Sequence, residues 1–466
     1  MDYKILTCGI LLLISLLSIR VTKKVQVPLL IMFLFIGIAA GSEGIGGIYF
    51  DDAKITQNIG NFALLFILFA GALETKKSDA MMALYPSGIL ATVGVFLTAI
   101  LAALAAYLLV PNFTLKEAFL FGAIVSSTDA AAVISMLGGS NLKKKIRTVI
   151  EIESGSNDPM AYALILFVLS LFNSGESTNI FMSIFFLFKQ IILGGVLGIL
   201  FGKITLPMGK ILKIEREEFL TIHVIAMLFI CYSATNILGG NGFLAIYLMG
   251  ILIGNEHFEF RMNCIKNMRV ASWLMQITMF IILGLLVFPS QLKAVMIRGS
   301  ILAILITIVA RMAVVFLLMS PFKYTKKEKF FMSWAGLKGA VPIIFSTTAI
   351  TAGIDNSQSI FNMVFYMVVF SVMIQGMTLK PLAKYLGLVE ESADEDASTI
   401  DLEELEELSL KKLYLDRKSE YVNKQIKDLN LPKSMHIISI RRGDEDIVPR
   451  GDVILKAGDK ILFSAK

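Results

Sequence analysis

The chain has 466 residues, of which 56% are hydrophobic and 17% are charged, and its mean hydropathy is +0.74. Soluble domains carry about 25% charged residues, so this composition excludes a soluble enzyme and indicates a protein that lies largely in a lipid bilayer. The net charge of +6 does not indicate a nucleic-acid partner, because the 43 Lys and Arg residues are scattered through short loops.

The hydropathy pattern before residue 388 predicts an all-α polytopic membrane domain. A stretch of about 17–25 apolar residues can cross a bilayer as a helix. The chain contains thirteen apolar segments, near residues 4–20, 25–41, 59–73, 88–110, 117–138, 149–172, 179–202, 219–238, 240–254, 271–289, 299–320, 330–350 and 360–380. We expect the first to be a span and not a signal peptide, because Asp2 precedes it and basic residues follow it.

The basic residues of the loops predict the orientation of the chain. Alternate loops carry about twenty Lys and Arg residues, whereas the other loops carry about five. Basic loops stay on the cytoplasmic side. The pattern therefore places the N-terminus outside and the C-terminus inside a cell membrane, which requires an odd number of spans.

The composition changes after residue 387. Residues 390–407 are acidic and contain no basic residue, so 388–407 is expected to be a solvated linker. Residues 408–466 alternate apolar and polar side chains between turn signals, which predicts a small soluble α/β domain. It has no GxGxxG loop that would indicate a dinucleotide site of its own. The expected units are thus 1–387, 388–407 and 408–466.

Ionisable residues inside predicted spans are candidates for the functional site. A charge at this depth costs several kcal/mol unless it is paired or hydrated. The chain has six such residues: Glu74, Asp129, Glu153, Asp158, Arg311 and Lys338. The three cysteines and three histidines have no metal-ligand spacing, so no metal cofactor is expected.

Asp158 follows E-I-E-S-G-S-N and precedes a long apolar run, so it lies one or two turns inside its span. A partly hydrated carboxyl group at this depth can bind either a proton or a cation, and that competition is the minimal chemistry of exchange. Asn157 places a neutral amide beside it. The alternative is a buried acid that a helix end or a neighbouring base satisfies.

Asp129 lies in S-S-T-D, between two apolar runs. Three hydroxyl residues before an acid favour an interrupted helix, and unwound backbone at membrane depth lines a cavity. A simple bend is the alternative. The twelfth segment has a similar interruption, W-A-G-L-K-G-A-V-P, with Gly336 and Gly339 around Lys338. Two broken spans at corresponding places predict inverted repeats, spans 1–6 and 8–13.

Glu153 and Arg311 each lie in an apolar run, and pairing them is the cheapest way to bury both charges. Such a pair would be a structural strut. Glu74 ends the third segment just before Lys76 and Lys77, so it is expected to be an interfacial acid paired with a lysine, or else part of the site.

These motifs together carry a family resemblance. S-S-T-D-A, E-S-G-S-N-D-P, the arginine at 311 and W-A-G-L-K-G-A-V-P resemble the NhaP-type branch of the monovalent cation:proton antiporter-1 family over residues 1–386. The tail resembles a TrkA-C (RCK C-terminal) domain through D-L-N-L-P, P-R-G-D and A-G-D-K-I-L. The combination is similar to potassium/proton antiporters of the cell-volume-regulation type.

The resemblance implies a thirteen-span homodimer that exchanges a monovalent cation for H⁺ by alternating access, through two broken helices that cross. It implies that Asp158 is the exchanged carboxylate and that the Asn157–Asp158 pair makes exchange electroneutral. It implies further roles for other residues: Thr128, Asp129 and Ser154 line the ion site, Glu74 is an auxiliary ligand, Glu153 and Arg311 form a buried ion pair, and Lys338, Gly336 and Gly339 support the second broken helix.

Two departures from the family pattern are visible. Lys338 stands where arginine is common, and Asn423 stands where the tail domain usually has glycine. Lysine offers a point charge in place of a planar fork. The resemblance also implies that the tail dimerises or binds a small regulatory ligand of nucleotide type.

The sequence leaves the identity of the exchanged ion undecided, and two other classes of protein are alternatives. Potassium is favoured by the tail, and sodium or lithium is the alternative; the role in either case is pH and cation or volume homeostasis. T-V-G-V-F at 92–96 is similar to part of a potassium-channel filter, but it lacks Tyr-Gly and a preceding pore helix. An intramembrane aspartyl protease would use Asp129 and Asp158 as a dyad.

Overall fold

The structure is a computed structural model of the chain. It describes residues 2–25, 28–137, 142–173, 180–214, 216–258, 260–389, 410–415, 419, 421–429, 435–442 and 445–465. The chain divides into two compact units, Met1–Glu390 and Glu391–Lys466. The expected linker at 388–407 lies almost wholly outside the described residues.

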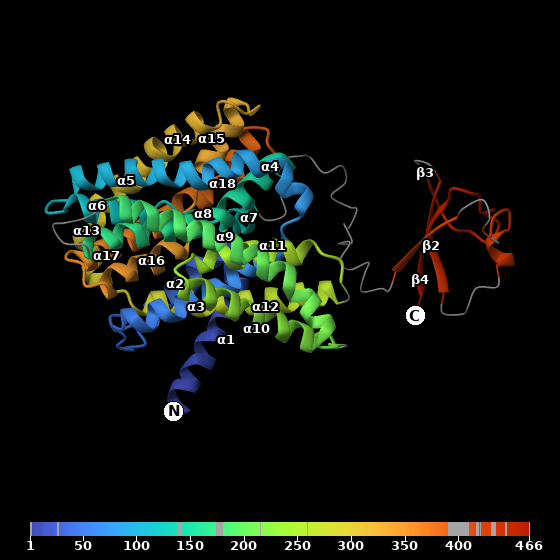
Figure 1. Cartoon of the computed structure of the whole chain (residues 1–466), viewed down its shortest axis with the longest axis horizontal. Helices are drawn as coiled ribbons and strands as arrows, with labels where there is room; N and C mark the ends of the chain where they lie inside the picture. The colour runs from blue at the N-terminus through green and yellow to red at the C-terminus, as the bar shows by residue number, and fades with distance from the viewer. Residues whose placement is uncertain are drawn as a thin grey trace. The chain divides into compact units, whose positions relative to one another are not determined.

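The first unit is helical throughout (Figure 1). In chain order its first half contains α1 (Asp2–Val25), α2 (Leu29–Ala40), α3 (Ala53–Glu74), α4 (Lys77–Ile89), the π-helix η1 (Leu90–Gly94), α5 (Val95–Leu109), α6 (Leu115–Ile124), α7 (Ala130–Leu137) and α8 (Lys144–Asn173). Its fourth helix begins at Lys77, eleven residues before the apolar segment that starts near 88, because the helix continues beyond the N-terminal end of that segment.

The second half repeats the same kinds of element. It contains α9 (Ile180–Ile211), α10 (Glu217–Ile237), α11 (Gly242–Asn255), α12 (Arg261–Leu285), α13 (Pro289–Ile304), the π-helix η3 (Leu305–Arg311), α14 (Met312–Leu318), α15 (Lys326–Trp334), α16 (Ala340–Thr351), α17 (Ser357–Ser371), the π-helix η4 (Val372–Gly376) and α18 (Met377–Tyr385). Among the described residues, eight helices are long and apolar enough to cross a membrane, and four more are shorter and apolar. The exact count of thirteen spans stays a prediction.

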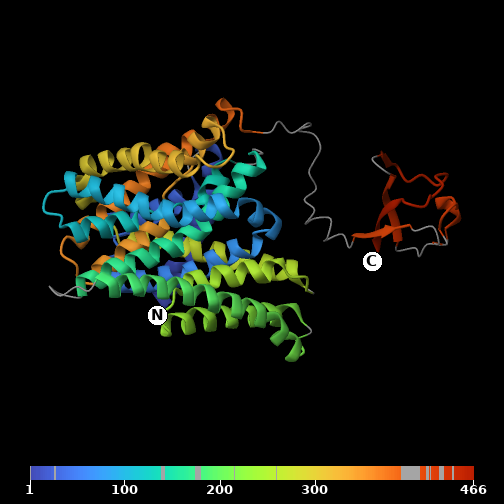
Figure 2. The same cartoon turned by 45° about the horizontal axis from the view of Figure 1, so that its top comes forward.

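The helices of this unit form two groups. α11 packs against α9 and α3, and α12 packs against α2, α3 and α10. On the other side α5 packs against α6, and α13 and α16 pack against α17. Figure 2 shows the two groups from a second direction. α8 contacts members of both groups, including α4, α6, α9 and α11.

The two broken helices are present where the sequence predicts them. α6 and α7 are separated by residues 125–129, and α15 and α16 are separated by residues 335–339. Both broken helices begin with a capping box, Thr114 with Glu117 and Thr325 with Glu328, in which each side chain bonds the other residue's backbone N–H. A helix with a π-turn precedes each of them. These matching features agree with the internal repeat that the placement of the two broken spans predicts.

The second unit contains a four-stranded antiparallel sheet in the order β1-β4-β2-β3. Its strands are β1 (Leu410–Tyr414), β2 (Met435–Arg442), β3 (Glu445–Ile447) and β4 (Lys460–Ala465). The apolar core under this sheet consists of Leu415, Ile440, Leu455 and Ile461. Among its described residues, this expected α/β domain contains the sheet and one 3₁₀ turn, Ile426–Asp428.

Candidate functional site: the crossing of two broken helices

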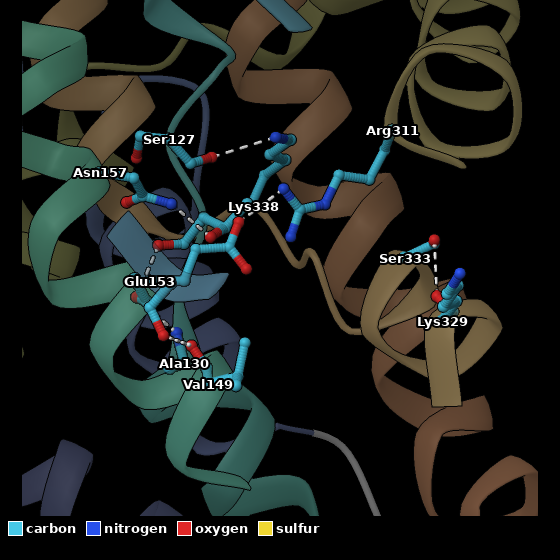
Figure 3. A network of polar contacts seen from close by, with 12 residues as sticks. Ser127, Ala130, Val149, Glu153, Asn157, Arg311, Lys329, Ser333 and Lys338 are labelled. Carbon is cyan, nitrogen blue, oxygen red and sulfur yellow. Dashed lines mark hydrogen bonds and ion pairs between the residues drawn. The ribbon is translucent and has the colours of Figure 1, made fainter. Parts of the chain in front are cut away.

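The two unwound segments bind each other directly. The backbone N–H of Asp129 donates to the carbonyl oxygen of Leu337 at 2.8 Å. The Lys338 ammonium, which is 4% exposed, donates to the carbonyl oxygen of Ser127 at 3.1 Å, as Figure 3 shows. Each unwound segment thus satisfies backbone groups of the other, which is how non-helical backbone is tolerated inside a membrane.

Glycines permit this close approach. A Cβ on Gly339 would collide with the carboxylate of Asp129, so no larger residue fits at this point of the crossing. A Cβ on Gly336 would lie 2.8 Å from Nε of Arg311. Both glycines therefore make room for charged side chains.

Asp129 also caps the second half of its own broken helix. Its Oδ1 accepts a hydrogen bond from the backbone N–H of Ala132 at 3.0 Å, at the start of α7. An acid is favoured here, because the N–H groups of a first helical turn have no partner within the helix.

α8 supplies the next layer of the site. The Ser154 hydroxyl donates to the Thr128 carbonyl at 2.8 Å and accepts from the Ala130 N–H at 2.9 Å. The Asn157 amide donates to the Thr128 hydroxyl at 2.6 Å. Ser154 and Asn157 thus fix the unwound segment of the first broken helix against α8. Figure 3 shows Asn157 at this contact.

Asp158 is 7% exposed, and its Oδ1 has no hydrogen-bond partner among the described residues. The same holds for Oδ1 of Asn157, the neighbouring residue. Asp158 interacts with the Ser127 hydroxyl and, electrostatically, with Asp129 and Lys338. Buried oxygens without partners are costly, so the unpartnered oxygen of this carboxyl group suits a site that a cation or a proton completes.

Glu153 and Arg311 form a buried ion pair beside this site. Arg311 Nη1 lies 2.6 Å from Glu153 Oε1, and the side chains are 6% and 3% exposed respectively. Arg311 is the last residue of η3. π-turns inside α-helices often occur at functional sites, and this one ends at the arginine that reaches α8.

Glu74 is not brought into this network. Its Oε1 lies 2.8 Å from Nε of Arg269 on α12, and both side chains are more than 40% exposed. The expected lysine partner at 76 or 77 is thus replaced by an arginine from another helix, which sequence spacing does not reveal.

Two further residues, Ser371 and Gln375, hold the second unwound segment, and no motif in the sequence indicated them. The Lys338 N–H donates to the Ser371 hydroxyl at 3.2 Å, Ser371 donates to Gln375, and Gln375 donates to the Trp334 carbonyl at 2.8 Å. Gln375 lies in η4. A buried glutamine in an apolar span was the signal that could have found this contact.

Comparison with known proteins places the chain in a family. The model of the transmembrane sodium/hydrogen exchanger matches residues 10–385, and that of the TrkA-C domain matches residues 413–466. The chain belongs to the sodium/hydrogen exchanger family. It is a transporter with a TrkA-C domain, so the protease reading is set aside.

Similar exchangers include proteins named for potassium. The chain is 34% identical to "K(+)/H(+) antiporter NhaP" of Alkalimonas amylolytica over 99% of this chain and 81% of that one. It is 35% identical to "K(+)/H(+) antiporter NhaP2" of Shewanella sp. strain ANA-3, over 97% and 79%. It is 25% identical to "Na(+)/H(+) antiporter NhaH" of Halobacillus aidingensis, over 81% and 97%.

The fold is that of a solved exchanger. The sodium proton antiporter MjNhaP1 from Methanocaldococcus jannaschii superposes with a TM-score of 0.71 at 22% identity, covering 82% of this chain and 98% of that one. T-V-G-V-F, which resembled a channel filter, lies within η1 and α5. Its carbonyl groups serve helical hydrogen bonds and cannot form a filter.

Proposed function

We propose that this cation/proton antiporter exchanges potassium for H⁺ at Asp158. The observation that carries the proposal is the unpartnered carboxyl oxygen of Asp158, a residue that interacts with Ser127, Asp129 and Lys338 of the two unwound segments. A carboxylate with neutral oxygens around it binds a hard monovalent cation, because such cations take oxygen ligands. Protonation of the same carboxyl group removes its charge and releases the cation.

The exchange cycle follows from this competition. A cation or a proton occupies Asp158, and alternating access moves the occupied carboxyl group between the two sides. Thr128, Asp129 and Ser154 line the site, while the Glu153–Arg311 pair and Lys338 hold the unwound segments in place. Proton entry drives cation export when the proton gradient is inward.

Potassium is proposed over sodium because the relatives with 34–35% identity are named for potassium, while the relative named for sodium is 25% identical. The test uses purified protein in liposomes with an acid interior and a pH dye. Adding KCl, NaCl or LiCl in turn should give the fastest dequenching with KCl. A faster response to NaCl or LiCl would replace the proposal by Na⁺(Li⁺)/H⁺ exchange.

We further propose that exchange is electroneutral. The position beside Asp158 is a neutral Asn157, so a single carboxyl group carries either one proton or one monovalent cation. Adding the permeant anion thiocyanate collapses any membrane potential and should leave the rate unchanged. A faster rate with thiocyanate would indicate net charge movement.

The assembly proposed for the cell has residues 1–387 in the plasma membrane as a homodimer, with the N-terminus outside. Residues 388–407 would link it to a cytoplasmic TrkA-C domain at 408–466 that senses a small ligand of nucleotide type. The loop charges and the family matches support this arrangement. Cysteine labelling from each side of intact cells tests the orientation.

A further inference from the structure

Tyr247 of α11 has a buried hydroxyl that is poorly satisfied. The residue is 4% exposed, and its Oη interacts with the Ser156 side chain but makes no well-formed hydrogen bond to a residue that the structure describes. A buried polar atom left without a good partner loses the hydrogen bonds that it would make in water, which destabilises the folded protein. A phenylalanine at position 247 would avoid this loss. The presence of a tyrosine therefore suggests that its hydroxyl has a function.

The ring of Tyr247 lies on the face of α8 that carries Asp158. A Cβ on Gly155 would lie 2.7 Å from Tyr247 Oη and 2.5 Å from its Cε2. Gly155 and Asp158 are three residues apart, so they are neighbours on one side of the helix. The Tyr247 hydroxyl also interacts electrostatically with Asp158.

This contact explains the glycine at 155. Glycine inside a helix is less favourable than alanine, and here any side chain would displace the tyrosine ring. The absence of a side chain at Gly155 thus lets the Tyr247 hydroxyl lie close to the backbone of α8. α11 belongs to the helix group of α3 and α9, so this oxygen comes from outside the two broken helices.

We propose that Tyr247 supplies a further oxygen ligand to the cation bound at Asp158. The inference rests on the proposed function of Asp158. The hydroxyl joins the unpartnered Oδ1 atoms of Asp158 and Asn157 as a neutral oxygen. A neutral ligand changes the affinity and selectivity for the cation, because it adds one oxygen to those that coordinate the ion. It leaves the charge transported per cycle unchanged.

The test is Tyr247→Phe, which removes one oxygen and keeps the ring. We expect the half-saturating KCl concentration for proton flux to rise about threefold to tenfold, with the maximal rate within about twofold of wild type. The ratio of K⁺ to Na⁺ half-saturation should change as well. Tyr232→Phe is the matched control, since this α10 tyrosine packs on Phe243 at 5.2 Å between ring centroids and should keep wild-type values.

A second measurement does not depend on transport. A cation that binds the folded protein raises its melting temperature in detergent, and Tyr247→Phe should need a higher KCl concentration for the same rise. Unchanged half-saturation, or a lower maximal rate alone, would overturn the ligand role. Absence of cation-driven flux in wild type would instead contradict the proposed function itself.

Discussion

Arg311 and Glu153 form an ion pair at 2.6 Å between η3 and α8, with both side chains almost fully buried. The pair lies beside the carboxyl group proposed to carry the ion. Because Gly336 leaves room for the guanidinium, three elements distant in sequence meet at this one contact.

Arg311→Ala is expected to destabilise the membrane domain by about 3–5 kcal/mol, because it leaves Glu153 as an uncompensated buried charge. The melting temperature in detergent measures the loss. Arg147→Ala is the control, since the Arg147–Glu151 pair lies on α8, the helix of Glu153, but is exposed. This substitution should cost only about 0.3–0.5 kcal/mol. Equal melting of the two variants would show that burial of the first pair has no energetic consequence.

Gly339→Ala should reduce exchange about tenfold or more, because the new methyl group would displace the Asp129 carboxylate from the crossing. Dye-reported proton flux in liposomes is the measurement. Gly195→Ala in α9 is the control, because nothing lies within 4 Å of its added Cβ. Wild-type flux in Gly339→Ala would mean that the crossing tolerates a wider separation.

The TrkA-C domain offers a prediction of pH dependence. Asp459 is fully buried and accepts two hydrogen bonds at 2.8 Å from Arg442 and one from the Lys456 N–H. Hydrogen bonds from Arg442 hold the pKa of Asp459 below its usual range. The folded carboxylate therefore contributes stability above its unfolded pKa of about 3.9, and this contribution is lost as the pH falls through the lower folded pKa.

Asp459→Asn should accordingly destabilise the domain at pH 7 by about 1.5–3 kcal/mol. Hydrogen exchange of β2 and β4 in the full chain measures this loss of stability. The difference in stability between the variant and wild type should shrink as the pH falls below the pKa of Asp459 in the folded domain. Asp452→Asn, at an exposed residue, is the control. A difference that stays constant down to the lowest pH would assign the effect to packing instead of charge.

The sequence predicted the two broken helices and the residues around them, because hydroxyl runs, glycines and buried charges have few uses in a membrane. Glu74 and Tyr247 illustrate what could not be predicted. Arg269 and Gly155, which contact them, are distant in the chain, and only the packing of α3 on α12 and of α8 on α11 brings each pair together. The start of α4 at Lys77 could not be predicted from the apolar segment near 88–110, because helices extend past their apolar segments.

The most direct test of the account is cation-driven proton flux in Asp158→Asn. Glu117→Gln is the matched control, since Glu117 is a buried carboxyl group, 2% exposed, that caps α6 outside the site. We predict that Asp158→Asn melts like wild type and shows no flux with KCl, NaCl or LiCl, while Glu117→Gln keeps its flux. Cation-driven proton flux retained in Asp158→Asn would contradict the proposal that this carboxyl group carries the exchanged ion.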